Sequence, residues 1–490
     1  MSSVPDRGNF LGHPKGLFLL FGTELWERFS YYAMRAILVL YLVDKVSSDG
    51  GFGLGWSNAS ALKLYGWFTG LVYITPILGG WLADNYLGQR RAIIIGGTLM
   101  AAGHFMLGTP HAWIPGMEQQ AFFLGLALLI AGNGLFKPNI STMVGDLYEQ
   151  GDHRRDGAFT IFYMGINVGA FLSGIVVGSV VQANGGNWQM GFITAGIGMV
   201  LSLVIQLMFA KKLLGDVGVV PSATASKAML TGSNTRHEPL TPVERDRIKV
   251  IFIMGVFTII FWAGFEQAGG LMNIYANEFT NRVVGSFTVP TTWFQSLNPL
   301  FIVLFAPVFA ALWVKMGDRE PTSPVKFGLG LVLLAVGFLF MVGATLQQGG
   351  DATVKTSMVW LVGAYFFHTM GELCLSPIGL SMVTKLAPLR LLSLMMGIWF
   401  GFTGLANYVA GWVGSFIGHG DTENQVNNAL SIFGGIAITA AIAGVVMWLL
   451  AGRLVDWMHG AEGAAAHPDT DDEIGVTGAH EAMPEKRPAG

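Results

Sequence analysis

Twelve apolar segments, each about as long as a helix needs to cross a bilayer, dominate this 490-residue chain. Hydrophobic residues make up 52% of the sequence and charged residues only 12%, about half the charged fraction of an ordinary globular protein. The segments lie at residues 17–43, 64–84, 92–109, 121–147, 158–182, 190–210, 247–270, 293–316, 326–347, 357–385, 390–418 and 430–455. Backbone groups in lipid must hydrogen-bond within their own segment, so these segments are expected to be helical. The sequence therefore predicts an all-α membrane protein with twelve transmembrane helices.

One long interior break, at residues 211–246, separates the first six segments from the last six. Its centre is rich in Ser, Thr and Gly, so we interpret it as a cytoplasmic linker between an N-terminal bundle (1–210) and a C-terminal bundle (247–458). Residues 459–490 carry no apolar periodicity and are predicted to be a disordered cytoplasmic tail. Two six-helix halves favour a pseudo-symmetric transporter with its site between them, near the middle of the membrane.

Lys and Arg residues are distributed unevenly over the connections between the segments. The even-numbered connections hold sixteen of them and the odd-numbered connections four. The positive-inside rule therefore places the even-numbered connections and both termini in the cytoplasm. Short connections and the lack of a transit peptide favour a bacterial inner (plasma) membrane.

The first apolar segment carries charges that a bilayer tolerates poorly. Glu24, Glu27, Arg28, Tyr31 and Arg35 follow i, i+3, i+4, i+7, i+11 spacing, which places them on one helical face. A charge in the centre of a membrane helix costs about 2.5–3.5 kcal/mol on insertion scales and is rarely kept without a function. We therefore expect this face to line a polar cavity between helices.

Short motifs are spread over both halves of the chain. They are Glu24-Leu-Trp-Glu27-Arg28-Phe-Ser-Tyr31-Tyr32, Gly80-Trp-Leu-Ala-Asp84 followed by Arg90-Arg91, Phe136-Lys137-Pro138-Asn139, Phe162-Tyr163 with Asn167 and Gly169, Phe261-Trp262 with Glu266, and Gly371-Glu372 with Ser376-Pro377. In this order they resemble the motifs of the proton-coupled oligopeptide transporter family within the major facilitator superfamily. The resemblance implies the two-bundle major facilitator fold and proton-driven symport of dipeptides and tripeptides into the cell by alternating access.

The resemblance also assigns the two ends of the peptide to the two halves. Arg28, Arg35 and Lys137 would hold the peptide carboxylate, since Arg grips a carboxylate with two donors and Lys adds a point charge. The alternative is that these cations only neutralise nearby Glu residues. Glu372 and Asn298 would hold the amino end, with Ser376 one helical turn beyond Glu372.

Other residues would contact the rest of the peptide. Tyr163 and Asn167 would bind its backbone, and the alternative for both is a hydrogen bond between helices. The expected aromatic walls for peptide side chains are Tyr32, Tyr73, Trp262, Phe265 and Trp399. Taken alone, aromatic residues in membrane helices are more often packing or interface residues, so only the resemblance favours this role.

Four carboxylates, Glu24, Glu27, Glu266 and Glu372, face three cations in the expected cavity. One carboxyl group is therefore left without a partner when the site is empty, and burial disfavours its charged form. We predict that Glu27 is the chief proton carrier, assisted by Glu24 and Glu266, and we count Arg28 among the proton-coupling residues. The resemblance implies two ion pairs between the halves, Arg35 with Glu266 and Lys137 with Glu372.

No cofactor is expected apart from the coupling protons. The single cysteine, Cys374, excludes an internal disulfide, and His368 with Glu372 lacks a third metal ligand. A net charge of −3 does not suggest a nucleic-acid partner. The expected partners are dipeptides, tripeptides, protons and membrane lipid, and we expect a monomer.

Three alternative functions remain open. A transporter of nitrate or another anion would not need Glu372 opposite the basic cluster. A drug antiporter of the same superfamily would usually lack the Glu24–Arg28 motif. A membrane-embedded hydrolase would need paired Asp residues, a Ser/His pair or an H-E-x-x-H motif, and the sequence contains none of these. We therefore predict a transporter rather than an enzyme.

Overall fold

The computed structural model describes residues 8–46, 50–149, 152, 154–221, 239–388, 391–418 and 422–461. The centre of the predicted linker, residues 222–238, lies outside them. The predicted tail also lies outside them from residue 462 onward. Helix is present at both ends of the segment predicted as a linker, since α6 extends to Leu213 and α8 begins at Pro242.

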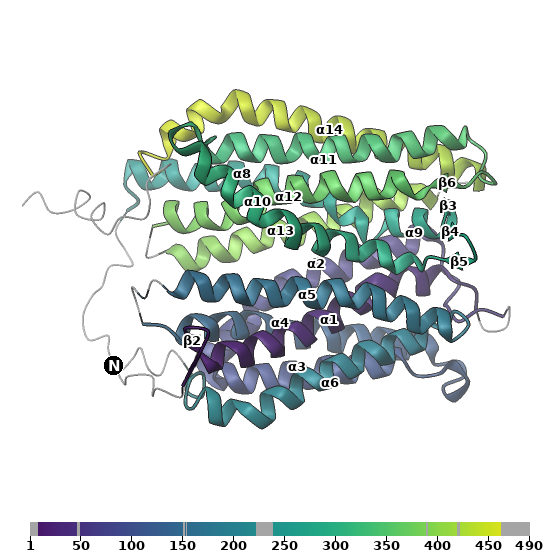
Figure 1. Cartoon of the computed structure of the whole chain (residues 1–490), viewed down its shortest axis with the longest axis horizontal. Helices are drawn as coiled ribbons and strands as arrows, with labels where there is room; N and C mark the ends of the chain where they lie inside the picture. The colour runs from purple at the N-terminus through teal and green to yellow at the C-terminus, as the bar shows by residue number, and fades with distance from the viewer. Residues whose placement is uncertain are drawn as a thin grey trace, which may run out of the picture.

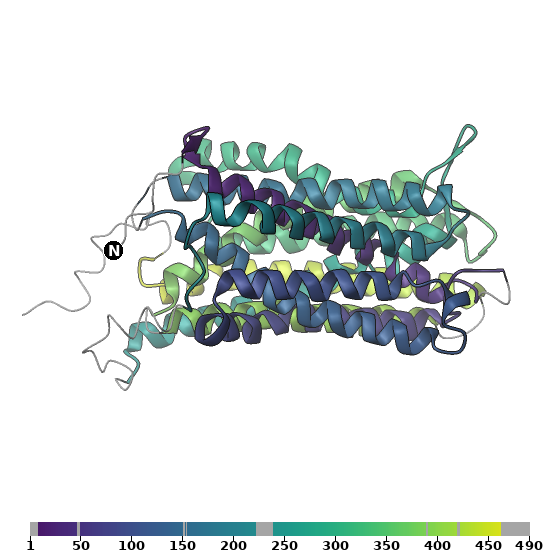
Figure 2. The same cartoon turned by 90° about the horizontal axis from the view of Figure 1, so that it is seen from below.

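Two bundles of long helices run along a common axis, as Figures 1 and 2 show from two directions. The N-terminal bundle consists of α1 (Lys15–Val43), α2 (Asn58–Leu82), α3 (Gln89–Leu107), α4 (Glu118–Asp146), α5 (Arg154–Ala183) and α6 (Trp188–Leu213). The C-terminal bundle consists of α8 (Pro242–Phe265), α9 (Leu271–Glu278), α10 (Leu297–Met316), α11 (Ser323–Gln348), α12 (Met358–Leu386), α13 (Leu392–Gly414) and α14 (Thr422–Trp457).

Short elements join the long helices at the two ends of the bundles. The helical turns are η2 (Ala83–Leu87), η3 (His111–Trp113), η5 (Glu266–Ala268), η6 (Thr291–Ser296), η7 (Gly317–Arg319) and η9 (Ser415–Gly418). The strands are β1 (Asn9–Phe10), β2 (His13–Pro14), β3 (Thr280–Asn281), β4 (Val283–Val284), β5 (Phe287–Thr288) and β6 (Thr356–Ser357). They pair as β1 with β2 and β4 with β5, both antiparallel, and β3 with β6, which is parallel.

Local sequence accounts for where several helices begin. At α8 the Thr241 side chain accepts from the backbone N–H of Glu244, and the Glu244 side chain accepts from the backbone N–H of Thr241. This reciprocal capping satisfies two helix donors, and Pro242 occupies a position where its missing N–H costs nothing. Ser57 and Ser357 cap α2 and α12 in a simpler way, each through its hydroxyl oxygen.

The predicted seventh span, 247–270, is not one continuous helix. Helix α8 ends at Phe265, the short turn η5 follows, and the chain becomes helical again as α9 from Leu271. Gly269 and Gly270 follow the turn, and Gly270 has φ −105° and ψ −103°, outside the helical region. Two adjacent glycines weaken a helix because they lose the most backbone entropy on folding. The break lies directly beside Glu266, one of the predicted site residues.

Nine stretches of the described chain are long and apolar enough to cross a membrane by length and composition. They include all the long helices except α1, α3 and α13. Helix α1 is long enough but not apolar enough, because Glu24, Glu27, Arg28 and Arg35 lie along it. These three helices pack among the nine: α1 on α5 and α6, α3 on α4, and α13 on α2.

The two bundles contact each other through α2 with α13 and through α5 with η6 and α10. Helix backbones meet at Gly66 and Gly411, where a Cβ atom on Gly411 would lie 2.5 Å from the Gly66 Cα atom. On the other side of the interface, Thr292 donates to the carbonyl of Gly174 (2.7 Å). These contacts lie toward the molecular end that holds the connections α1–α2 and α5–α6, which we call the odd-connection end.

Replacement of Gly411 by Ala is expected to lower the midpoint of thermal unfolding in detergent by several degrees. The added methyl group overlaps the α2 backbone, and overpacking of this kind costs about 1–3 kcal/mol. Gly401→Ala is the matched control, because it lies on the same helix with open space around it and should gain helix propensity. Equal midpoints for the two variants would contradict a tight contact between α2 and α13.

Candidate functional site

A cavity of about 310 Å³ lies between the two bundles. Twelve of the fifteen predicted site residues line it, from both halves of the chain: Tyr32, Arg35, Tyr73, Lys137, Tyr163, Asn167, Trp262, Glu266, Asn298, Glu372, Ser376 and Trp399. Phe265, also expected as an aromatic wall, lines it too. Glu24, Glu27 and Arg28 are not among the lining residues.

The N-terminal wall of the cavity carries its cations. The Lys137 ammonium group lies 4.2 Å from the centre of the Tyr73 ring, and the Arg35 guanidinium 5.8 Å from that of Tyr32. Both distances allow cation–π attraction. Within the described part of the chain Lys137 makes no ion pair, so its charge is available to a bound anion.

Glu24, Glu27 and Arg28 form a buried cluster of their own on α1. Arg28 donates to both oxygens of Glu27, one of them at 2.7 Å, and its Nε lies 3.1 Å from Oε1 of Glu24. All three side chains are at most 4% exposed, and the second oxygen of Glu24 has no hydrogen-bond partner among the described residues. Asn133 on α4 also donates to Glu27, at 3.4 Å. Two carboxylates share one cation here, so one proton could be taken up without removing the ion pair.

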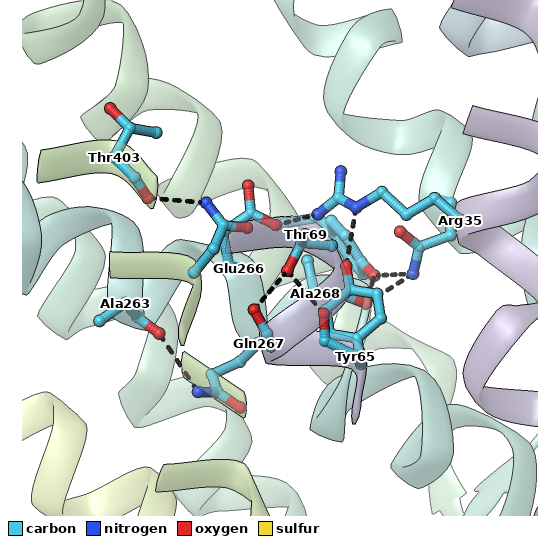
Figure 3. A network of polar contacts seen from close by, with 12 residues as sticks. Arg35, Tyr65, Thr69, Ala263, Glu266, Gln267, Ala268 and Thr403 are labelled. Carbon is cyan, nitrogen blue, oxygen red and sulfur yellow. Dashed lines mark hydrogen bonds and ion pairs between the residues drawn. The ribbon is translucent and has the colours of Figure 1, made fainter. Parts of the chain in front are cut away.

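Arg35 forms an ion pair with Glu266, and this pair joins the two bundles (Figure 3). Arg35 lies on α1 and Glu266 on the turn η5, at the break of the seventh span. Arg35 also donates through Nε to the Tyr65 hydroxyl of α2, at 2.7 Å. This is one of the two expected ion pairs between the halves.

The other expected pair, Lys137 with Glu372, is not formed in this structure. Glu372 on α12 instead accepts a hydrogen bond from the Asn298 side chain of α10, at 2.7 Å. Asn298 also donates to the hydroxyl of Thr369, at 3.1 Å. A carboxylate that an amide holds, and that forms no ion pair with a described residue, can receive an ammonium group. Ser376 lines the cavity one turn along α12.

The remaining predicted residues complete the walls. The Asn167 side chain donates to the carbonyl of Tyr163 one turn back on α5, at 3.0 Å, rather than to another helix among the described residues. Trp262 packs edge-on against Phe265, with ring centres 5.1 Å apart. Trp399 contributes an aromatic surface from α13. The C-terminal wall is thus largely aromatic around Glu372.

Sequence reasoning missed several polar lining residues, above all Gln295 and Tyr365. Gln295 donates to the carbonyl of Ala268 at 2.6 Å and to the Tyr365 hydroxyl at 3.0 Å. The sequence did contain a signal that could have identified them. Gln295 precedes Asn298 by three residues, and Tyr365 precedes Glu372 by seven. Those spacings place each missed residue on the same helical face as a predicted one.

His368 is buried on α12 between aromatic rings, 4.5 Å from the Phe338 ring centre and 6.5 Å from that of Phe265. The only cysteine, Cys374, is buried as well. In the described residues no three His, Cys, Asp or Glu side chains gather in a way that could hold a metal ion. Both side chains are buried among the helices of the C-terminal bundle.

Comparisons with known proteins place the chain in one family. A family model described as the POT family matches residues 90–228 and 241–430. A peptide transporter of Yersinia enterocolitica is 36% identical over 92% of this chain and 96% of its own length. Dipeptide and tripeptide permease A of Escherichia coli is 31% identical over 91% of this chain and 94% of its own length. An uncharacterized transporter of Bacillus subtilis is 40% identical over 82% of this chain and 87% of its own length.

Solved structures agree with the sequence matches. The crystal structure of peptide transporter POT in complex with sulfate is 38% identical and covers 94% of this chain and 98% of its own, with a TM-score of 0.83. A POT family transporter in complex with a thioalcohol conjugated peptide is 32% identical and covers 92% of this chain and 99% of its own, with a TM-score of 0.80. The chain is therefore a membrane protein of the major facilitator fold and a member of the proton-coupled oligopeptide transporter (POT) family.

Proposed function

We propose that this protein imports dipeptides and tripeptides by proton-driven symport. The observation that carries the proposal is a cavity with the cation Lys137 on its N-terminal wall and the carboxylate Glu372 on its C-terminal wall, neither in an ion pair with a described residue. A zwitterion with opposite charges at its two ends matches this arrangement. The named peptide transporters among the relatives support the same substrate class.

The proposed binding mode follows the charges of the two walls. Arg35 and Lys137 receive the peptide carboxylate, with Arg28 close behind them on α1, and Glu372 with Asn298 receives the amino end. Tyr163 and Asn167 contact the peptide backbone. The aromatic surfaces of Tyr32, Tyr73, Trp262 and Trp399 form walls for the side chains. A longer peptide would displace one charged terminus from its partner, which accounts for a preference for two or three residues.

The odd-connection end is proposed to face the outside of a bacterial inner membrane, following the positive-inside rule. Hydrogen bonds between the bundles gather toward this end, such as Asn58 to Gln425 (3.3 Å), Gln182 to the Thr288 carbonyl (3.1 Å) and Asn273 to the Ala36 carbonyl (2.8 Å). We therefore propose that the cavity is closed toward the outside and exchanges with the cytoplasm. This is the peptide-releasing stage of an alternating-access cycle.

Glu27 is the proposed chief proton carrier, assisted by Glu24, Arg28 and Glu266. A proton on the Glu24–Glu27 pair removes the excess negative charge of the buried cluster, and a proton on Glu266 weakens its ion pair with Arg35. The bundles can then separate at the outer end. A membrane potential of 100 mV supplies about 2.3 kcal/mol per charge, which sustains roughly 50-fold accumulation of a neutral zwitterion.

A direct test is uptake of labelled dialanine into proteoliposomes with an inward proton gradient and an inside-negative potential. We expect accumulation that a protonophore abolishes and that dipeptides and tripeptides, but not free alanine, compete away. In the same assay Glu27→Gln should lose uphill accumulation but still exchange labelled for unlabelled peptide, and Glu149→Gln, an exposed carboxylate, should behave as the parent. An intact, inserted protein that does not accumulate dialanine would favour anion transport, with nitrate as the next substrate.

Replacement of Glu372 by Gln is expected to raise the KM for peptides with a free amino terminus at least tenfold. The reason is the loss of one charge-assisted contact to the ammonium group, since such contacts are about twice as strong as neutral hydrogen bonds. The KM for N-acetylated peptides should change much less. Competition of each peptide class against labelled dialanine measures both values, and an equal loss for both classes would refute the assignment of the amino end.

A further inference from the structure

The break between α8 and α9 leaves a backbone carbonyl that is satisfied by side chains from other elements. This carbonyl, on Ala268, accepts from the Gln295 side chain at 2.6 Å and from the Tyr365 hydroxyl at 3.2 Å. Gln295 and Tyr365 are also hydrogen-bonded to each other, at 3.0 Å. The turn η5, which carries Glu266 and Ala268, is therefore fixed by side chains from η6 and α12.

A second set of hydrogen bonds continues from Tyr365 to the amino-end carboxylate. The Thr369 hydroxyl donates to the Tyr365 carbonyl at 2.7 Å and accepts from Asn298 at 3.1 Å. Asn298 in turn donates to Glu372 at 2.7 Å. Thr369 is fully buried, so water does not compete for its hydroxyl. Each member from Ala268 to Glu372 is thus bonded to the next.

The same turn is fitted tightly to the N-terminal bundle. A Cβ atom on Gly269 would lie 2.0 Å from the Tyr65 hydroxyl, so only glycine lets Tyr65 reach the Arg35 guanidinium in this arrangement. Figure 3 shows Tyr65, Arg35 and Glu266 around the turn that carries Ala268. A small displacement of η5 would therefore act directly on the ion pair between Arg35 and Glu266.

We infer that Gln295, Tyr365 and Thr369 are positioning residues that couple the binding of a peptide amino group at Glu372 to the ion pair between Arg35 and Glu266. The inference rests on the proposed function. An ammonium group at Glu372 competes with the Asn298 amide for the carboxylate oxygen. The resulting shift of Asn298 reaches η5 through Thr369 and Tyr365, and packed, hydrogen-bonded elements of this kind transmit such shifts. Binding at one wall thus changes how firmly the outer end is closed.

The test measures the outer end directly by double electron–electron resonance. Nitroxide labels are placed at Ala183→Cys and Val354→Cys, exposed positions of the two bundles at the odd-connection end, in a Cys374→Ala background without other cysteines. Distances are recorded with and without saturating dialanine. In the labelled parent, dialanine should change the ratio of closed to open molecules. In Thr369→Val, which keeps the shape but loses the hydroxyl, that change should shrink about fivefold, as for loss of one or two buried hydrogen bonds.

Two further variants separate coupling from packing. Thr369→Ser keeps a hydroxyl and should restore the response. Thr258→Val is the matched control, because Thr258 is equally buried and donates to a carbonyl within α8 (2.9 Å) outside this set of bonds. A Thr369→Val response equal to that of the parent would overturn the coupling and leave the proposed function intact. A parent that neither binds nor responds to dialanine would overturn both.

Discussion

We propose that closure of the odd-connection end depends on one interaction, the ion pair between Arg35 and Glu266. It joins α1 of one bundle to the broken seventh span of the other, beside a cavity whose charges come from both halves. A buried ion pair contributes little net stability, because desolvation of both charges offsets their attraction, yet removal of one partner is strongly destabilising. Such a pair suits a moving contact, and we propose that protonation of Glu266, which leaves Arg35 without its countercharge, lets the halves separate.

The buried charges of Glu24, Glu27 and Arg28 form an ion cluster within α1 instead of a pair between the bundles. Arg28 is held within its own helix by two carboxylates, away from the cavity walls. This cluster has room for one proton without losing its central cation. In the proposed function, the carboxylates of this α1 cluster store a proton, and the cavity charges Arg35, Lys137 and Glu372 hold the peptide. We propose that Arg35 and Glu266 connect the two sets.

The charged part of the candidate site could be predicted from the sequence because a charged residue within an apolar segment is costly and is rarely kept without a function. The spacing from Glu24 to Arg35 indicated one polar face, and most residues carried over from the motifs line a single cavity. The face is nevertheless divided: Arg35 reaches the cavity, whereas Glu24, Glu27 and Arg28 stay behind its wall. Residue spacing predicts which face of a helix a side chain lies on. It does not predict whether that side chain reaches the cavity or is buried between helices.

The features that could not be predicted from the sequence depend on tertiary contacts. At the break after Phe265, the carbonyl of Ala268 accepts hydrogen bonds from Gln295 and Tyr365, which come from distant segments. The pair Lys137–Glu372 was expected from the family, but in this structure Glu372 accepts a hydrogen bond from Asn298 instead. A sequence encodes all states of a transporter, whereas one structure contains one of them.

The dependence of the closed outer end on this ion pair is tested by the distance between labels at Ala183→Cys and Val354→Cys in the Glu266→Gln variant without peptide, since Gln mimics a protonated Glu266. We predict a larger fraction of molecules with a widened outer end than in the parent. We also predict return to the closed distance when the ion pair is rebuilt in reverse by Arg35→Glu with Glu266→Arg. Identical distance distributions in the parent and Glu266→Gln would show that the ion pair does not hold the outer end closed.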